Sequence, residues 1–311
     1  MQARSFPVIS RPALSSYGMK SFLVGICLAF ATSLCAADRL PFGVVFKGQD
    51  RFQAVAARVQ PQMPSLRALP IGERVAWFGQ LLVGTPYKGH TLEIDDRIEA
   101  PSCNLYGLDC WTFFESALAF ARMCELPPEK WSPAQMLAYI EQDRYWSGRC
   151  TGSYLSRLHY LEHWAQDNDR RGLMKDLTRS LGGIGVLNAA RGMTQNADGY
   201  RYMANSAQNR AAIARLEADL RKEPLYMIPK SKVAGIESRL QNGDIIGIIS
   251  KDGSAYGTSH VGIAIRKGGV LHFMHASSPR NHGKVVIDTR LSDYLGRYKT
   301  HAGILVARPL R

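Results

Sequence analysis

The sequence lacks the features that define several common protein classes. Six cysteines in 311 residues are too few for a disulfide scaffold, and their spacing matches no zinc site. There is no internal repeat and no basic-aromatic nucleic-acid signature, and Gly183-Ile-Gly185 lacks the third glycine of a dinucleotide-binding loop. Acidic residues are scarce, at 26 against 39 Lys and Arg, which gives a net charge of +13. The 46% of hydrophobic residues predict a folded protein. The positive net charge favours an anionic partner.

The first 37 residues have the order of a secretory signal peptide. Lys20 precedes an apolar run at 21–30, which is too short for a good membrane-spanning helix, and small residues follow at 31–37. We expect cleavage after Ala37, with an uncleaved N-terminal anchor as the alternative. Met19 would make a more ordinary signal start than Met1. The mature chain then has a net charge of +10 and is exported to the periplasm or the cell exterior. We expect a monomer with no stable membrane anchor and no nucleic-acid partner.

The order of the patterns predicts an α+β protein, because helical periodicity dominates early and short β-type runs come last. We expect an N-terminal arm with one helix at 38–71, then a catalytic domain at 72–311 with an all-helical insertion at about 130–235. The helices are expected at 72–84, 109–123, 132–146, 154–167 and 206–222, and the strands at 244–249, 260–265, 270–274, 285–287 and 303–306.

Cys110 is the candidate nucleophile, because it follows Asp109 at the expected start of a helix. Asp109 can cap that helix, and the partial positive charge of a helix start is expected to lower the pKa of the thiol. A nucleophilic cysteine needs a histidine base and a partner that orients the base. His260, expected to begin a strand, and His275, at the end of the next strand, supply both across the Gly268-Gly269 turn. The alternative is a buried structural cysteine.

Three strings carry a resemblance to a known superfamily. They are Leu108-Asp-Cys110-Trp-Thr-Phe, Thr258-Ser-His260-Val-Gly-Ile and Met274-His275-Ala-Ser-Ser. With the Gly84-Thr-Pro-Tyr-Lys-Gly loop and the Asn242-Gly-Asp turn, they resemble the NlpC-type superfamily of papain-like cell-wall hydrolases. The resemblance implies a papain-like core, with Cys110 at a helix N-terminus packed on an antiparallel sheet, and no cofactor.

Trp111-Thr112 stands where the peptidase branch of that superfamily has Ser-Gly. This departure, with Ser156-Arg-Leu-His-Tyr160 and Trp164, is similar to the N-acetylmuramoyl-L-alanine-amidase-like branch. The resemblance implies hydrolysis of the amide between N-acetylmuramic acid and L-Ala in peptidoglycan or muropeptides. The alternative within the superfamily is a γ-D-glutamyl-diamino-acid endopeptidase.

Five residues are candidates for substrate binding, and each has a structural alternative. Tyr87 can also simply finish a turn, and Asp109 can act only as a helix cap. The full set is Tyr87, Asp109, Trp111, Arg157 and His159.

Two other functions remain open. His159-Tyr-Leu-Glu162-His163 fits the inverted zinc-protease pattern and makes a zinc peptidase a weaker alternative. A wall-binding module that keeps the fold without catalysis is the other. Disulfide pairing among Cys103, Cys124 and Cys150 stays undetermined.

Overall fold

The computed structural model describes residues 40–310, so the expected signal peptide at 1–37 lies outside the described residues. One antiparallel sheet organises this part of the chain, with the strand order β4-β5-β10-β6-β7-β8-β9 and β3 paired to β10. Its five long C-terminal strands correspond to the five predicted β-type runs. They are β6 (Ile245–Asp252), β7 (Ala255–Lys267), β8 (Val270–Ala276), β9 (Val285–Arg290) and β10 (His301–Pro309).

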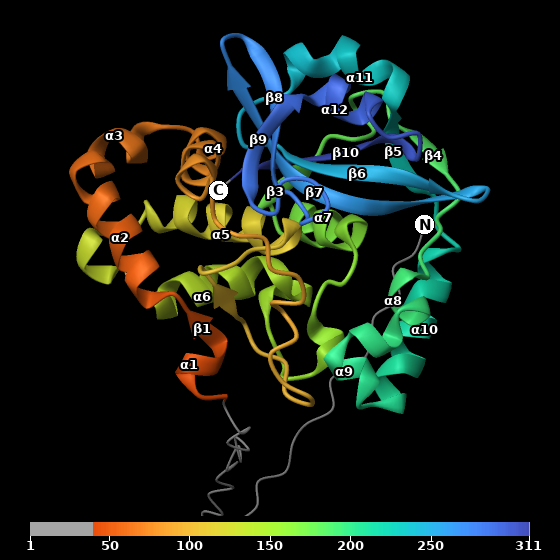
Figure 1. Cartoon of the computed structure of the whole chain (residues 1–311), viewed down its shortest axis with the longest axis horizontal. Helices are drawn as coiled ribbons and strands as arrows, with labels where there is room; N and C mark the ends of the chain where they lie inside the picture. The colour runs from red at the N-terminus through yellow and green to blue at the C-terminus, as the bar shows by residue number, and fades with distance from the viewer. Residues whose placement is uncertain (1–39, 311) are drawn as a thin grey trace, which may run out of the picture. The chain divides into compact units, whose positions relative to one another are not determined.

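Helices cover both faces of the sheet, as Figure 1 shows. Below the sheet in that view lie α5 (Cys110–Met123) and α7 (Leu161–Arg170), and above it lie α11 (Lys230–Ile236) and α12 (Leu291–Gly296). Neighbouring side chains of one strand therefore enter different cores: Ile263 packs in the α5 core, and Ala264 packs in the α12 core. This period of two is what a strand buried on both faces requires. The α+β prediction is confirmed.

The β7–β8 hairpin forms at the predicted turn. Lys267 pairs with Val270, so Gly268 and Gly269 make a two-residue loop. Both glycines have positive φ, 55° and 81°, which a tight turn of the I′ type needs and which L side chains rarely adopt. The turn thus fixes the register that brings the strands of His260 and His275 side by side.

The long predicted helices are present within a residue or a few of their expected bounds. They are α4 (Ile71–Leu81), α5, α6 (Pro133–Arg144) and α10 (Ala207–Leu220). The predicted helix at 154–167 is displaced, because residues 154–156 form a 3-10 turn and α7 begins only at Leu161. The arm holds more than the one helix expected: α1 (Phe42–Val45), α2 (Gln49–Val59) and α3 (Met63–Ala68), with β1 (Phe46–Lys47) pairing to β2 (Cys103–Asn104).

The expectation of an all-helical insertion is wrong. Between about 130 and 235 the chain also forms β3 (Met174–Asp176), β4 (Ile184–Val186) and β5 (Leu225–Pro229), which join the sheet beside β10. These strands are too short to give a sequence period. Pairing with other strands supplies the hydrogen bonds that stabilise them: β3 and β5 pair with β10, and β4 pairs with β5. One part of the insertion, α8 (Gly192–Gln195), α9 (Arg201–Ala204) and α10, packs around a small core of its own.

Two further predictions concern the membrane and the cysteines. Within residues 40–310 no helix combines the length and hydropathy needed to cross a membrane. Cys103, Cys110, Cys124 and Cys150 are all free in the structure, so the described chain has no cross-link among them.

Candidate active site

Cys110 is the first residue of α5. Asp109 is the N-cap: its side chain accepts a hydrogen bond from the Thr112 backbone N–H at 2.8 Å, and the Thr112 hydroxyl accepts one from the Asp109 N–H at 3.0 Å. This reciprocal pair is a capping box, and it holds the helix start in one geometry. The predicted capping role of Asp109 is confirmed.

The expected depression of the thiol pKa is wrong for the free protein. Burial raises the pKa of Cys110 to about 12, and the neighbouring Asp109 carboxylate raises it further. The backbone N–H groups of Val261, Trp111 and Cys110 itself act in the opposite direction, but they do not compensate for the loss of water. The thiol is therefore protonated at neutral pH. It lies beside the backbone of Val261, the residue that follows His260.

His260 does not begin a strand, as the sequence predicted, but lies in the middle of β7. Ile248 pairs with His260 while the next residue, Ile249, pairs with Thr258, so Ser259 is an extra residue in β7. Such a β-bulge changes the direction in which the following side chain points. Two positions on, a Cβ on Gly262 would lie 2.5 Å from the Met274 carbonyl oxygen, so only glycine allows β7 and β8 to approach this closely.

A chain of three side chains runs from His260 across the sheet. His260 Nε2 lies 2.7 Å from His275 Nδ1, and His275 Nε2 lies 3.4 Å from Asp288 Oδ2. Arg297 donates to the other Asp288 oxygen at 2.8 Å. Asp288 also lies at a bulge, because β9 has one more residue than β8 between the pairs His272–Arg290 and Met274–Ile287. Two bulges thus position the two ends of the chain.

The protonation states along this chain follow from its geometry. The hydrogen bond from His275, with Arg297 nearby, holds the pKa of Asp288 well below its usual range, so the carboxylate only accepts. His275 then carries its proton on Nε2 and accepts at Nδ1 from His260 Nε2–H. That tautomer leaves Nδ1 of His260 as the basic nitrogen. Burial, with His275 and His301 nearby, lowers the pKa of His260 to about 3, so the ring is neutral.

The loop that contains Tyr87 is fixed to both halves of the site. The Tyr87 N–H donates to the Gly283 carbonyl at 2.8 Å, and the Leu108 N–H donates to the Pro86 carbonyl at 3.0 Å. Burial, with Cys110 and Asp109 nearby, raises the pKa of the Tyr87 hydroxyl to about 12. The hydroxyl therefore keeps its proton and remains a hydrogen-bond donor.

A cleft of about 280 Å³ opens at Cys110. All five candidate substrate residues line it, and Glu93 and Tyr200 add to its wall. Arg157 is not a free cation there, because its guanidinium forms ion pairs with Glu93 at 3.1 Å and Glu99 at 2.5 Å. The Trp111 indole N–H donates to Glu115 at 2.8 Å, which leaves its ring at the cleft.

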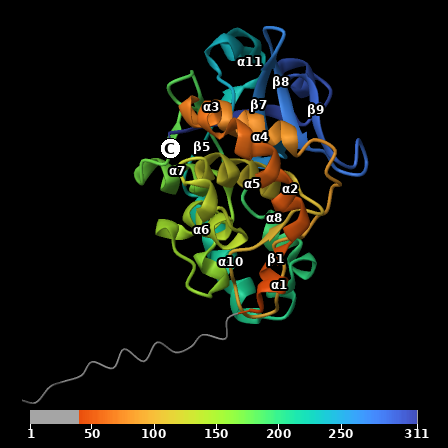
Figure 2. The same ribbon diagram turned by 90° about the vertical axis from the view of Figure 1, so that its left-hand side faces the viewer.

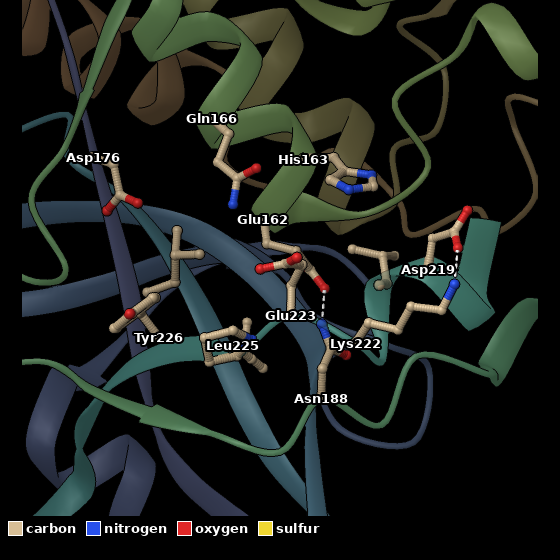
Figure 3. A pocket seen from close by; sticks show the side chains of 13 residues that line it. Glu162, His163, Gln166, Asp176, Asn188, Asp219, Lys222, Glu223, Leu225 and Tyr226 are labelled. Carbon is tan, nitrogen blue, oxygen red and sulfur yellow. Dashed lines mark hydrogen bonds and ion pairs between the residues drawn. The ribbon is translucent and has the colours of Figure 1, made fainter.

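The inverted zinc-protease spacing does not bring its two histidines together. His159 precedes α7, lines the Cys110 cleft, and has its Nε2 2.8 Å from the Tyr154 carbonyl oxygen. Glu162 and His163 lie on α7 and line a different pocket, of about 290 Å³, where Asn188 donates to Glu162 at 3.1 Å (Figure 3). In residues 40–310 no three His, Cys, Asp or Glu side chains are grouped as metal ligands.

Sequence reasoning missed two residues of the site. Asp288 follows an unremarkable apolar run, and no local signal marks it as the partner of His275. Tyr294, on α12, packs its ring 5.2 Å from that of His275 and lies near enough to Cys110 for the thiol to raise its pKa. A search for polar residues on strands flanking a candidate histidine would have found Asp288 but not Tyr294.

Comparisons with known proteins identify the family of this chain. The family model described as AmiA-like, N-acetylmuramoyl-L-alanine amidase-like, matches residues 77–304. The chain therefore belongs to the N-acetylmuramoyl-L-alanine amidase-like family. No curated protein matches it.

Solved structures agree with the fold. An N-acetylmuramoyl-L-alanine amidase from Bacteroides uniformis is 29% identical with a TM-score of 0.68, over 78% of this chain and 99% of that one. A candidate xylanase from Bacteroides fragilis is 34% identical with a TM-score of 0.66, over 75% and 99%. A Legionella pneumophila protein, 23% identical with a TM-score of 0.61 over 85% and 97%, is similar in fold alone.

Proposed function

We propose that this protein is an exported cysteine amidase that hydrolyses the amide between N-acetylmuramic acid and L-Ala in peptidoglycan or muropeptides. The observation that carries the proposal is the Cys110 thiol at a capped helix start, beside a strand whose His260 is linked to His275 and Asp288. Membership of the amidase-like family and the Bacteroides uniformis amidase support the choice of bond. A helix bearing the nucleophile and packed on an antiparallel sheet also supports a papain-like core of the NlpC type.

The proposed reaction is acyl transfer. Cys110 sulfur attacks the lactyl carbonyl carbon as its proton passes to His260. His260 then delivers that proton to the nitrogen of L-Ala, the C–N bond breaks, and a thioester remains. Water attacks the thioester, again losing its proton to His260, which restores the thiol and releases the carboxylic acid.

Supporting groups follow from the same geometry. His275 and Asp288 would hold the His260 ring in the tautomer with a basic Nδ1. The backbone N–H groups around Cys110 and the protonated Tyr87 hydroxyl would donate to the oxyanion of the tetrahedral intermediate. Because thiol and imidazole are both neutral at rest, the proton moves during attack rather than before substrate binds.

Glycoside hydrolysis, the activity in the name of the Bacteroides fragilis protein, would need a carboxylic acid and a carboxylate at the reacting bond. The cleft offers Asp109 and Glu93. Asp109 accepts from Thr112, and Glu93 is paired with Arg157, so both are already committed to structural bonds. This favours the thiol as the reacting group.

Mass spectrometry of the products from a defined disaccharide-tetrapeptide tests the proposal. Free disaccharide and free tetrapeptide are expected, and a chelator should leave their rate of formation unchanged. Loss of a dipeptide would instead assign the γ-D-glutamyl bond of the endopeptidase alternative. Turnover that needs a metal ion would overturn the cysteine mechanism.

A further inference from the structure

A second groove lies on the other side of the 84–87 loop, which contains Tyr87. It measures about 420 Å³ and is lined by one face of α2 together with the segment that follows α4. Figure 2 shows α2 and α4 on the same side of the molecule. We call it the arginine groove, and its lining is Arg51, Ala54, Val55, Arg58, Leu81, Leu82, Val83, Gly84, Thr85, Pro86, Leu105 and Tyr106.

The charged residues that line this groove are both arginines. Arg51 and Arg58 are seven residues apart on α2, so they lie on one helix face, and no carboxylate is among the lining residues. Within residues 40–310 neither side chain has an ion-pair partner. The adjacent Asp50 is exposed and accepts a hydrogen bond from the Tyr106 hydroxyl at 2.5 Å. The Asp50 carboxylate thus lies at the Tyr106 rim of the groove, where Arg51 helps to lower its pKa, and the two guanidinium groups supply the positive charge of the lining.

The wall of the groove is apolar and exposed. Val83 and Tyr106 are 43% and 52% exposed, so apolar surface is open to a ligand there. A ligand that fits must carry anionic groups together with short apolar ones. The carboxylates and methyl groups of a short acidic peptide have that combination.

The arginine groove and the Cys110 cleft share a wall. Gly84, Thr85 and Pro86 line the groove, and the next residue, Tyr87, lines the cleft. The cleft has no comparable free cation, because Arg157 is its one lining Arg or Lys and is paired with Glu93 and Glu99. It does carry the aromatic rings of Trp111 and Tyr200, which suit a sugar.

We propose that the arginine groove binds the carboxylate-bearing peptide part of the substrate while the sugar part occupies the Cys110 cleft. This inference rests on the proposed amidase function and adds the orientation of its substrate. The peptide crosses the 84–87 loop, and Arg51 and Arg58 pair with its carboxylates. The positive charge of the protein thus acts at a defined place beside the reacting bond.

The first test measures binding of the free tetrapeptide to the Cys110→Ala protein by calorimetry. Arg51→Gln with Arg58→Gln should weaken peptide binding by roughly ten-fold, as expected for two exposed ion pairs. Binding of the disaccharide alone should not change. Arg215→Gln, an exposed arginine on α10, is the matched control and should leave peptide affinity unchanged. The Cys110→Ala protein with both arginines intact is the parent in these comparisons. Added salt should weaken peptide binding to this parent more than to the variant that also lacks both arginines.

The second test separates charge from shape. A tetrapeptide whose carboxylates are amidated should bind the parent and the double variant equally. The inference is overturned if the free acid also binds both proteins equally, if Arg215→Gln causes the same loss, or if the parent binds no peptide. Because binding is measured without turnover, these outcomes are independent of which bond the enzyme cleaves.

Discussion

Two buried polar clusters flank α5, and they are built in opposite ways. On the sheet side, His260 and His275 are held neutral by burial and end on the single carboxylate of Asp288. On the helical side, full charges are paired: Arg144 donates to Glu115 at 2.7 Å and 3.0 Å. Helix α5 touches both clusters. Cys110, at its start, lies on the sheet side, and Glu115, five residues later, belongs to the helical side.

This difference indicates different roles for the two clusters, one in proton transfer and one in holding the structure. A neutral imidazole can take a proton from one reacting group and return it to the next, and no existing ion pair is broken in doing so. The Arg144–Glu115 pair cannot, because each ion loses its partner if the other is neutralised. Burial raises the pKa of Glu115, while Arg144 acts against that shift and keeps the pair together. We infer that the sheet side moves protons and the helical side fixes the position of α5.

The largest expected effect is at the proposed nucleophile. Cys110→Ala should lower kcat by at least about 10⁴-fold, because the reacting atom is removed. The melting temperature should stay close to that of the parent, since alanine suits a helix start packed against Val261. Product formation from disaccharide-tetrapeptide, with circular dichroism on the same sample, measures both. Undiminished turnover would remove Cys110 from the mechanism.

The next effect is on stability, on the helical side. Arg144→Met should lower the free energy of unfolding by about 3–5 kcal/mol, because Glu115 is left buried without its counter-ion. Adding Glu115→Leu should recover most of that loss. Denaturant unfolding gives the comparison, with Arg191→Met in the exposed Arg191–Asp252 pair as the control, expected to change by less than about 1 kcal/mol. Equal losses at both sites would contradict the scaffold role.

A smaller effect is expected at the far end of the histidine chain. Asp288→Asn replaces the carboxylate, which only accepts, by an amide that can also donate and so permits the other His275 tautomer. We expect kcat to fall by about 10²-fold with little change in KM. The matched control is Asp293→Asn, an exposed carboxylate on α12 that should leave kcat unchanged. Steady-state kinetics on both variants decide the point, and an unchanged kcat in Asp288→Asn would confine that residue to a structural role.

The smallest effect is the pH dependence of stability. Burial lowers the pKa of His260 and of His159 to about 3 in the folded protein, below the value of about 6.5 for an unfolded histidine. The unfolded chain therefore binds protons more readily, and stability falls as the pH drops from about 6.5 toward 3. The melting temperature should decrease by roughly a few degrees per pH unit in that range, and His159→Gln should make the slope shallower. A melting temperature that is flat from pH 7 to pH 4 would contradict the burial of neutral imidazoles.

Local patterns allowed much of the fold to be predicted. Asp109 caps α5 as expected, and Ser132 caps α6 in the same way, because a side-chain oxygen before a helix satisfies free N–H groups whatever the rest of the chain does. The Gly268-Gly269 turn formed for the same kind of local reason. Short strands such as β4 were missed, because their stability comes from pairing with a distant strand.

The sequence was enough to select the members of the candidate site, but not to predict their pKa shifts and ion pairs. The strings around Cys110, His260 and His275 mark residues that the structure gathers at one end of the sheet. The direction of the thiol pKa shift was wrong, since a helix start stabilises a thiolate only as far as burial permits. Asp288 and the pairing of Arg157 depend on contacts between segments far apart in sequence.

By itself, the sequence determined the helix caps, the hairpin turn, the α+β class and the identity of the candidate nucleophile and its histidines. These depend on residues within a few positions of each other or on short strings. Only the tertiary structure decided that two bulges aim His260 and Asp288 and that Arg157 is paired. It also decided that Arg51 and Arg58 line a groove next to the cleft. The free energy of a charged side chain depends on its burial and on its ion-pair partners. Neither can be predicted from the residues next to it in the sequence.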